Sequence, residues 1–214
     1  MTTASVPVTH TAAPPVETGL PGRRTLVGLS VAYLLLFVAL LLVSGGEIAN
    51  DAHGSTVIRE FSKSATLVQV TGYAMVVAAV LVVFWGAALR RRLGRTWTAD
   101  LVGIGALAMG ITLVGWVVTG FALMHAVDSG IPAVAQAVNI MNNSNFVPAM
   151  LALACMMIGA GTAGLRTGTL PRWLAVASIA LGSLAPLGPA AFLPFTLFPL
   201  WAVTVSAKVR LDGS

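Results

Sequence analysis

The stretch TLVQVTGYAMVVAAVLVVFWGAALRRRLGR, residues 66–95, decides the fold class of this chain. Residues 66–89 form a run of 24 without a charged side chain, and four arginines lie within residues 90–95. As an α-helix the run rises about 36 Å, which is enough to cross a hydrocarbon core of about 30 Å. The arginines then end the apolar segment where a helix leaves the bilayer. This pattern predicts a transmembrane helix.

The composition of the whole chain also indicates a membrane protein. Its 214 residues are 57% hydrophobic and 9% charged, whereas a soluble domain is about 25% charged. A soluble fold of this length has too little interior to bury so much apolar surface, so we expect the lipid bilayer to cover it. The formal charge of +5 lies at the ends of apolar runs and not on a basic, aromatic-interleaved surface, which argues against nucleic acid as a partner.

Six apolar segments predict an all-α polytopic membrane bundle with six transmembrane helices, as one domain covering residues 23–210. The first segment is longer than the core of about 7–15 residues in a secretory signal, so we expect it to be retained. Residues 1–22 are rich in Thr, Pro and Ala without apolar periodicity, which predicts a disordered cytoplasmic tail. The six expected helices cover about residues 25–43, 66–89, 99–124, 146–165, 172–187 and 190–207.

The basic residues orient these helices. Ten of the twelve lysines and arginines fall on one side of a six-helix alternation, and only Arg59 and Lys63 fall on the other. The positive-inside rule then places both termini in the cytoplasm, with Trp85, Trp97 and Trp173 in the headgroup region of that side. Ten arginines against two lysines, with abundant Ala, Gly and Val, are typical of a GC-rich bacterial genome. We therefore expect the bacterial cytoplasmic membrane.

Two long loops, residues 44–65 and 125–145, lie on the opposite side of this bundle. STVIREFSKS in the first loop carries an apolar stripe that includes Val57 and Phe61. IPAVAQAVNIMNNSNF in the second loop has Pro132 in a first helical turn, a position that suits proline. We expect two short interfacial helices that lie as lids on the outer leaflet.

Glycines recur at spacings that favour close helix packing. They occupy every fifth position along the third apolar segment, and the fourth contains small-xxx-small pairs. Small residues let helix backbones approach in lipid, where no hydrophobic force operates between helices. We expect these faces to pack within the bundle, and homo-oligomerisation through the Gly-rich faces is the alternative. The residues are Gly105, Gly110, Gly115, Gly120, Gly159 and Gly164.

Three ionisable residues gather in SGGEIANDAHGS, residues 44–55. Glu47 follows the first helix after a flexible glycine pair, so we expect its carboxyl near the membrane interface. A carboxyl partly withdrawn from water has a raised pKa and can act as an acid or proton carrier. We interpret Glu47 as a candidate catalytic acid with Asp51 or His53 as its hydrogen-bond partner. The alternative is that all three are solvated loop residues.

The same stretch does not match a metal site. An EF-hand frame with Gly54 at its sixth position puts Ala49 and His53 where oxygen ligands are required. Ligand spacing typical of zinc is also missing. The lone Cys155, inside an apolar run, rules out a disulfide within the chain. We therefore expect no metal and no cofactor.

Polar residues at the outer ends of neighbouring helices predict an outward-facing polar vestibule that binds a ligand. MHAVDSG ends the third helix and NIMNNSNF precedes the fourth, on the same face as Glu47. The helix centres carry no ionisable side chain, which argues against a proton-coupled transporter or an ion channel. The candidate pocket residues are Gln69, Trp116, Phe121, Met124, His125, Asp128, Asn142, Asn143 and Asn145.

The chain resembles a large group of small six-helix bacterial membrane proteins, many of them uncharacterised. The resemblance rests on DSGIPAVAQAVNIMNNSNFVP, residues 128–148, a Gly-rich helix, and LRTGTLPRWLAVAS, residues 165–178. It covers most of residues 25–207 and implies an architecture but no activity. A fainter likeness, in length, hydrophobicity and a carboxyl after an early helix, is to the small integral-membrane terpene cyclases. It implies a carboxylic acid that protonates an isoprenoid inside a helical bundle.

Three functions follow as hypotheses. The leading one is an inner-membrane protein that binds a lipid, a hydrophobic small molecule or a membrane partner in the vestibule. The first alternative is a terpenoid cyclase-like, membrane-embedded enzyme in which Glu47 initiates a reaction on an isoprenoid or lipid. The second alternative is a small transporter subunit. The residues leave open whether the protein is an enzyme.

Overall fold

The computed structural model describes residues 22–43 and 48–210. The expected tail up to residue 21 and the candidate acid Glu47 lie outside the described residues. The described part of the chain is all-helical, without a strand. Its elements are α1 (Arg23–Val43), α2 (Gly54–Ser62), α3 (Ala65–Arg92), α4 (Trp97–Asp128), α5 (Pro132–Ser144), α6 (Phe146–Thr167), α7 (Arg172–Leu184), the 3₁₀ helix η1 (Gly188–Ala191) and α8 (Phe192–Lys208).

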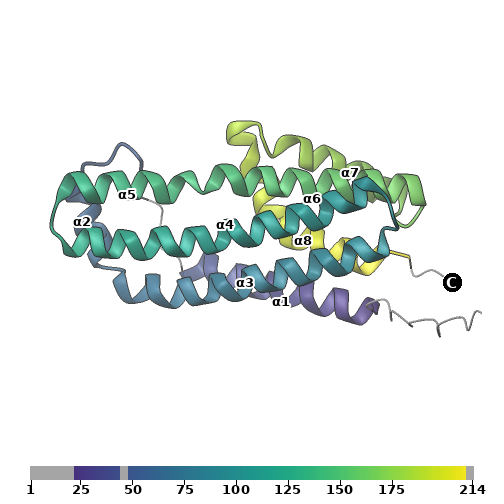
Figure 1. Ribbon diagram of the computed structural model, residues 1–214, viewed down its shortest axis with the longest axis horizontal. Helices are drawn as coiled ribbons and strands as arrows, with labels where there is room; N and C mark the ends of the chain where they lie inside the picture. Colours follow the sequence, from purple (N-terminus) through teal and green to yellow (C-terminus); the bar gives the residue numbers. More distant parts are fainter. Residues whose placement is uncertain (1–21, 44–47, 211–214) are drawn as a thin grey trace, which may run out of the picture.

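The long helices run along one axis of the molecule (Figure 1). α1, α4 and α7 begin at one end, where α3, α6 and α8 finish (Figure 1). We call it the arginine-rich end. Opposite it, the distal end is formed by α2, α5 and the last turns of α4. The cations beside the helix boundaries at the arginine-rich end are Arg23, Arg24, Arg90, Arg91, Arg92, Arg95, Arg166, Arg172, Lys208 and Arg210.

Five segments of the described chain are long and apolar enough to cross a membrane, which makes this a multi-pass membrane protein. They are α1, α3, α4, the continuous α5–α6 segment, and η1 with α8. The sixth expected span, α7, is apolar but has 13 residues, so it rises only about 20 Å. It ends at Leu184, short of residue 187, because Pro186 has no N–H to continue the helical hydrogen bonds.

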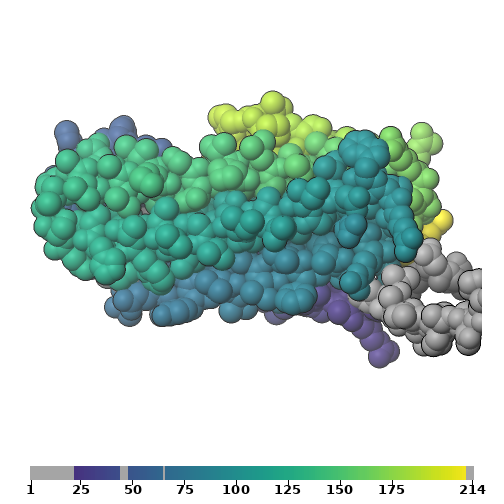
Figure 2. All heavy atoms as spheres, in the orientation of Figure 1, coloured from purple at the N-terminus to yellow at the C-terminus, as the bar shows by residue number. Residues whose placement is uncertain are grey.

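The expected second lid is an extension of α6. Only Asn145 separates α5 from α6, and its backbone keeps right-handed helical angles (φ −62°, ψ −16°). Figure 1 shows the two helices almost in line; together they cover 36 residues, a rise of about 54 Å. α4 packs along both, and in Figure 2 these three helices form the central band of the visible face. Residues 132–144 therefore lengthen the bundle and do not fold across it.

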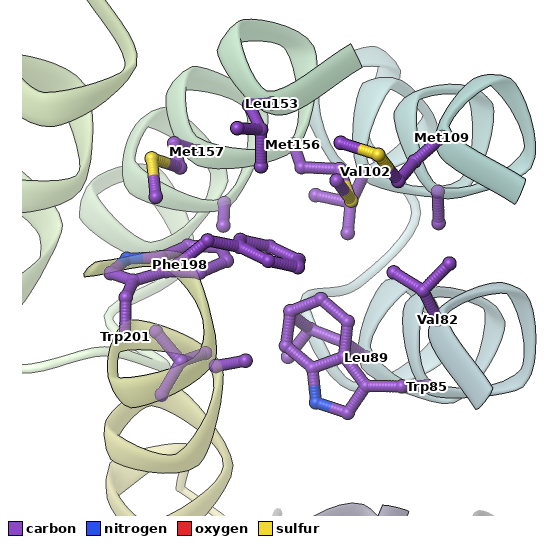
Figure 3. Packing of buried hydrophobic residues seen from close by; sticks show 14 of the residues in the cluster. Val82, Trp85, Leu89, Val102, Met109, Leu153, Met156, Met157, Phe198 and Trp201 are labelled. Carbon is purple, nitrogen blue, oxygen red and sulfur yellow. The ribbon is translucent and has the colours of Figure 1, made fainter. Parts of the chain in front are cut away.

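We call the part of the molecule built from α1, α3, α4, α6, α7 and α8 the six-helix half. An aromatic cluster forms its core (Figure 3). The ring centroids of Trp85, Phe198 and Trp201 lie 5.7 to 6.0 Å apart. Trp85 Nε1 donates to Ser206 Oγ and Trp201 Nε1 donates to Ser178 Oγ, each at 2.8 Å. A buried indole N–H without a partner would be costly, so the two serines allow large rings to fill the bundle axis.

The position of Trp85 corrects an expectation. Trp85 lies inside the bundle with 2% of its surface exposed, and so does not sit in the headgroup region. Trp97 and Trp173, by contrast, are 64% and 60% exposed at the arginine-rich end. The difference arises because Trp85 lies on the face of α3 that meets α8, which hydropathy alone does not reveal.

Two of the expected packing glycines bring α4 and α6 into backbone contact. A Cβ atom on Gly105 would lie 2.7 Å from the carbonyl oxygen of Ala152. A Cβ atom on Gly159 would lie 2.8 Å from the carbonyl oxygen of Thr98. These glycines serve contacts within the chain, as small residues do where helices associate in lipid.

The distal end has a small core of its own. α2 packs on α5 and α4, and Val57, Leu123, Val127 and Ala135 are buried together there. Gly54 begins α2 directly against the Pro132 carbonyl oxygen at the start of α5, and a Cβ atom would overlap that oxygen. Glycine at position 54 therefore allows the close approach of α2 to α5.

Candidate functional site

A cavity of about 310 Å³ lies between α1, α3, α4 and α8, with one residue each from α2 and α5 at its edge. Most of its wall is apolar. The aromatic side chains that line it are Tyr33, Phe37, Phe61, Trp116 and Phe195. A concave, mainly apolar space with a few polar groups is the usual form of a small-molecule site. This cavity is the candidate functional site.

Missing side chains on α3 and α4 help to create the space. Gly72 and Gly120 both line the cavity. The nearest atoms to a Cβ on Gly120 would be Val68 Cγ1 at 3.9 Å and Asn142 Oδ1 at 4.0 Å. Gly120 therefore borders open space, whereas Gly105 on the same helix makes a tight helix contact.

The distal edge of the cavity is polar. The Thr119 hydroxyl lies 2.8 Å from Asn142 Oδ1 and 2.9 Å from Asn145 Nδ2, and Asn145 Nδ2 also donates to the Asn142 carbonyl oxygen at 3.1 Å. These bonds fix the Asn142 amide at the cavity edge. Its Nδ2 group makes no hydrogen bond with any residue of the described chain. It is a donor available to a ligand.

Tyr33 supplies a second polar group deeper in the bundle. Its ring packs edge-on against Phe198 with centroids 5.5 Å apart, and only 6% of its surface is exposed. Within residues 22–43 and 48–210 nothing hydrogen-bonds to its hydroxyl. Every fully enclosed polar side-chain atom in this part of the chain has a partner, so the Tyr33 hydroxyl borders open space. A ligand atom there would relieve a desolvation cost of about 1–3 kcal/mol.

Two other asparagines hold the chain that follows α1 onto α5. Asn143 Nδ2 donates to the Ile48 carbonyl oxygen at 3.0 Å and to Asn50 Oδ1 at 2.8 Å. Asn139 Nδ2 donates to the Ile48 and Ala49 carbonyl oxygens at 3.3 and 3.4 Å. We call residues 48–50 the strap. Asn143, expected in the pocket, therefore contacts the strap and does not line the cavity.

Two of the three candidate catalytic residues, Asp51 and His53, do not line the cavity. Asp51 and His53 are exposed at the start of α2, and His53 makes no side-chain cap bond there. Glu47 lies outside the described residues. In the part of the chain that the structure describes, no group of three His, Cys, Asp or Glu side chains is placed to hold a metal ion.

Of the nine candidate pocket residues, some line or support the cavity and the others lie elsewhere in the structure. Trp116 and Asn142 line the cavity, and Asn145 supports Asn142 through Thr119. Phe121 packs against the ring of Tyr73 with centroids 6.4 Å apart, outside the cavity. Met124 is half-buried and does not line it. The residues exposed on the surface are Gln69, His125 and Asp128.

Sequence reasoning missed most of the lining residues, among them three aromatic residues from the two ends of the chain. Tyr33 and Phe37 lie on α1, and Phe195 lies on α8. Tyr33 carried a usable signal, since it is one of two tyrosines and sits in the middle of an apolar run. The two phenylalanines carried none, because their neighbours in sequence are equally apolar.

Comparison of the chain with protein-family models, with curated proteins and with solved structures gave no match, so the candidate site rests on the geometry of this chain's own residues.

Proposed function

We propose that this protein binds a hydrophobic small molecule or a single lipid chain in the cavity between α1, α3, α4 and α8. The observation that carries the proposal is the apolar 310 Å³ space bordered by two hydrogen-bonding groups without a partner in the described chain, the Tyr33 hydroxyl and Asn142 Nδ2. Its volume lies near the lower end of the range of about 300–1,000 Å³ for small-molecule sites. An elongated apolar molecule with one hydroxyl or carbonyl group matches this arrangement.

The proposal places the protein in a bacterial cytoplasmic membrane, with six crossings and both termini in the cytoplasm. Gathering of ten of the twelve lysines and arginines at one end supports this orientation. In this arrangement α7 and α8 form the last hairpin, α2 lies at the outer interface, and the cavity edge that carries Asn142 faces the outer side.

A membrane-embedded cyclase is the second candidate, and the aromatic wall is the observation that favours it. Five aromatic residues line a cavity in a chain that is 7% aromatic. Aromatic faces stabilise cations, including those formed from isoprenoids. This reaction also needs an acid, and none of the described lining residues carries a carboxyl group. Glu47 is the residue proposed for that role, and Glu47→Gln should abolish product formation if the proposal holds.

Filling the cavity tests the binding proposal. Gly120→Leu puts four carbons into the space, and Gly28→Leu places the same side chain on α1 at a position where a Cβ would meet no atom of the described residues within 4 Å. Native mass spectrometry of detergent-solubilised protein with farnesol, a 15-carbon isoprenoid alcohol, gives the readout. We expect Gly120→Leu to lose binding and Gly28→Leu to keep it. Equal binding by both variants would contradict the proposal.

The polar contact is tested with a matched pair of probes. Tyr33→Phe keeps the ring and removes the hydroxyl. We expect its affinity for farnesol to fall about fivefold, the effect of a hydrogen bond of about 1 kcal/mol. Binding of farnesene, which lacks the hydroxyl, should stay unchanged. A parallel loss of both probes would show that Tyr33 acts through packing alone.

A further inference from the structure

A second hollow, of about 650 Å³, lies at the arginine-rich end on the turn between α3 and α4. The side chains of Arg90, Arg91, Arg95, Trp97 and Asp100 line it. In Figure 2 this turn protrudes at the surface beside the end of α6. It is independent of the cavity in the bundle and of the function proposed for that cavity.

Arg90 is the one arginine of the hollow that is held by an ion pair with a described residue. Arg90 lies across α4 with its Cδ 3.0 Å from where a Cβ on Gly103 would be. Its Nε donates to Asp100 Oδ1 at 2.6 Å. This pair holds the guanidinium in place and neutralises Asp100, the carboxylate that would otherwise repel an anion. The remaining N–H donors of Arg90 make no hydrogen bond with any described residue, so they are available to a ligand in the hollow.

Arg91 and Arg95 supply charge that the described chain leaves unpaired. Neither makes an ion pair with any described residue, and both are exposed. The N-terminus of α4 opens beside them, capped by Thr96, whose side chain accepts from the Ala99 N–H at 3.2 Å. The helix dipole adds positive potential there. The electrostatic potential in the hollow is therefore positive, which favours binding of an anion.

Trp97 lines the hollow and also begins an exposed apolar stripe on α4. Its indole is 64% exposed, and the Arg166 guanidinium carbon lies 5.8 Å from the ring centroid. Ile104 and Ile111 follow at seven-residue intervals on the same face of α4, 60% and 65% exposed. A molecule with a charged head in the hollow would lay its apolar chain along this stripe.

We propose that the hollow binds the phosphate of an anionic phospholipid from the leaflet that meets the arginine-rich end. Arg91 and Arg95 contact the phosphate, Arg90 orients it, and the acyl chains follow Trp97, Ile104 and Ile111. Planar guanidinium groups suit phosphate oxygens because they donate two parallel hydrogen bonds. A soluble phosphate compound offers the same head chemistry without the chains, so the stripe on α4 distinguishes the two sources.

Lipid titration of the full chain in detergent tests this proposal. The probes are phosphatidylglycerol, phosphatidylcholine and inorganic pyrophosphate, with the first bound molecule counted by native mass spectrometry. The test variant is Arg91→Gln/Arg95→Gln. Arg172→Gln/Lys208→Gln is the matched control, because it removes two charges at the same end from residues that do not line the hollow.

We expect the wild-type chain to bind phosphatidylglycerol more tightly than phosphatidylcholine. The test variant should lose about fivefold in affinity for each arginine removed, and the control should lose about twofold or less. The melting temperature in phosphatidylcholine should not change in the test variant, since both side chains are exposed. Equal affinity for the two lipids, or an equal loss in both variants, would overturn the proposal. Pyrophosphate binding without a lipid preference would overturn the lipid assignment.

Discussion

The six-helix half and the distal end of this molecule are held together by different interactions. In the six-helix half, apolar rings fill the axis and Gly105 brings the α4 backbone against α6. At the distal end, a core of four buried residues is supplemented by asparagine side chains that bind the strap. In lipid, apolar side chains gain little from leaving the hydrocarbon, so close packing and internal hydrogen bonds decide which helices associate.

The distribution of polarity on α5 shows the same principle. Asn139 is buried against the strap, while Ile140 and Met141 are 41% and 60% exposed. This order, with polar groups inside and apolar groups outside, reverses that of a soluble helix. The cavity lies where the two regions meet, since Phe61 and Asn142 come from the distal end and Tyr33 and Phe195 from the six-helix half. A destabilising substitution in either region should therefore disturb a different part of the cavity wall.

The largest effect is expected from Gly105→Val in the six-helix half. A Cβ there would lie 2.7 Å from Ala152 O and 2.9 Å from Met156 N, and these backbone atoms cannot rotate away. We expect a loss of about 2–4 kcal/mol in the free energy of unfolding. Thermal melting in detergent measures it. Gly28→Val is the control, because a Cβ there would meet no atom of the described residues within 4 Å. Equal melting temperatures for the two variants would show that the α4–α6 contact is not limiting.

Gly54→Ala should lower the stability of the distal end and leave that of the six-helix half unchanged. The added methyl would overlap the Pro132 carbonyl oxygen and lift α2 from α5. We expect a local loss of about 1–3 kcal/mol, seen as faster hydrogen exchange in the strap and α2 while α6 and α8 keep their protection. Ser55→Ala, at the exposed neighbouring residue, should leave exchange unchanged. Faster exchange throughout the molecule would contradict the separation into two regions.

The smallest effect is expected from pH, through Glu60 on α2. Hydrogen bonds from Lys63 Nζ (2.8 Å) and Arg59 Nε (2.9 Å) lower the pKa of Glu60 below its ordinary value of 4.5. A lowered folded-state pKa stabilises α2 above pH 4.5, and that stabilisation is lost as the pH falls through the lower folded value. The ion pairs are exposed, so the change is small.

Hydrogen exchange in α2, corrected for its intrinsic pH dependence, measures this effect. The Glu60→Gln variant should show no such loss on acidification, because its side chain does not titrate. A wild-type chain whose α2 protection is equal at pH 6 and pH 3 would show that these surface pairs contribute nothing.

The amino-acid sequence by itself determined the class of structure and the position of the charges. Runs such as residues 66–89 contain too much hydrocarbon for any solvent but lipid, and in lipid a chain must satisfy its backbone hydrogen bonds within helices. The arginines after such a run mark where the helix leaves the bilayer. Both are local properties, so they can be read without knowing the neighbours of a helix.

Only the tertiary structure decided where each helix ends and which faces meet. α5 continues into α6 through Asn145, α7 stops at Leu184, and Trp85 turns inward to Ser206. It also assembled the cavity, whose walls include Tyr33 from α1 and Phe195 from α8. A helix in lipid is apolar on every face, so its sequence has no periodicity to mark the buried one. The inward face is set by the fit of side chains between helices far apart in the chain.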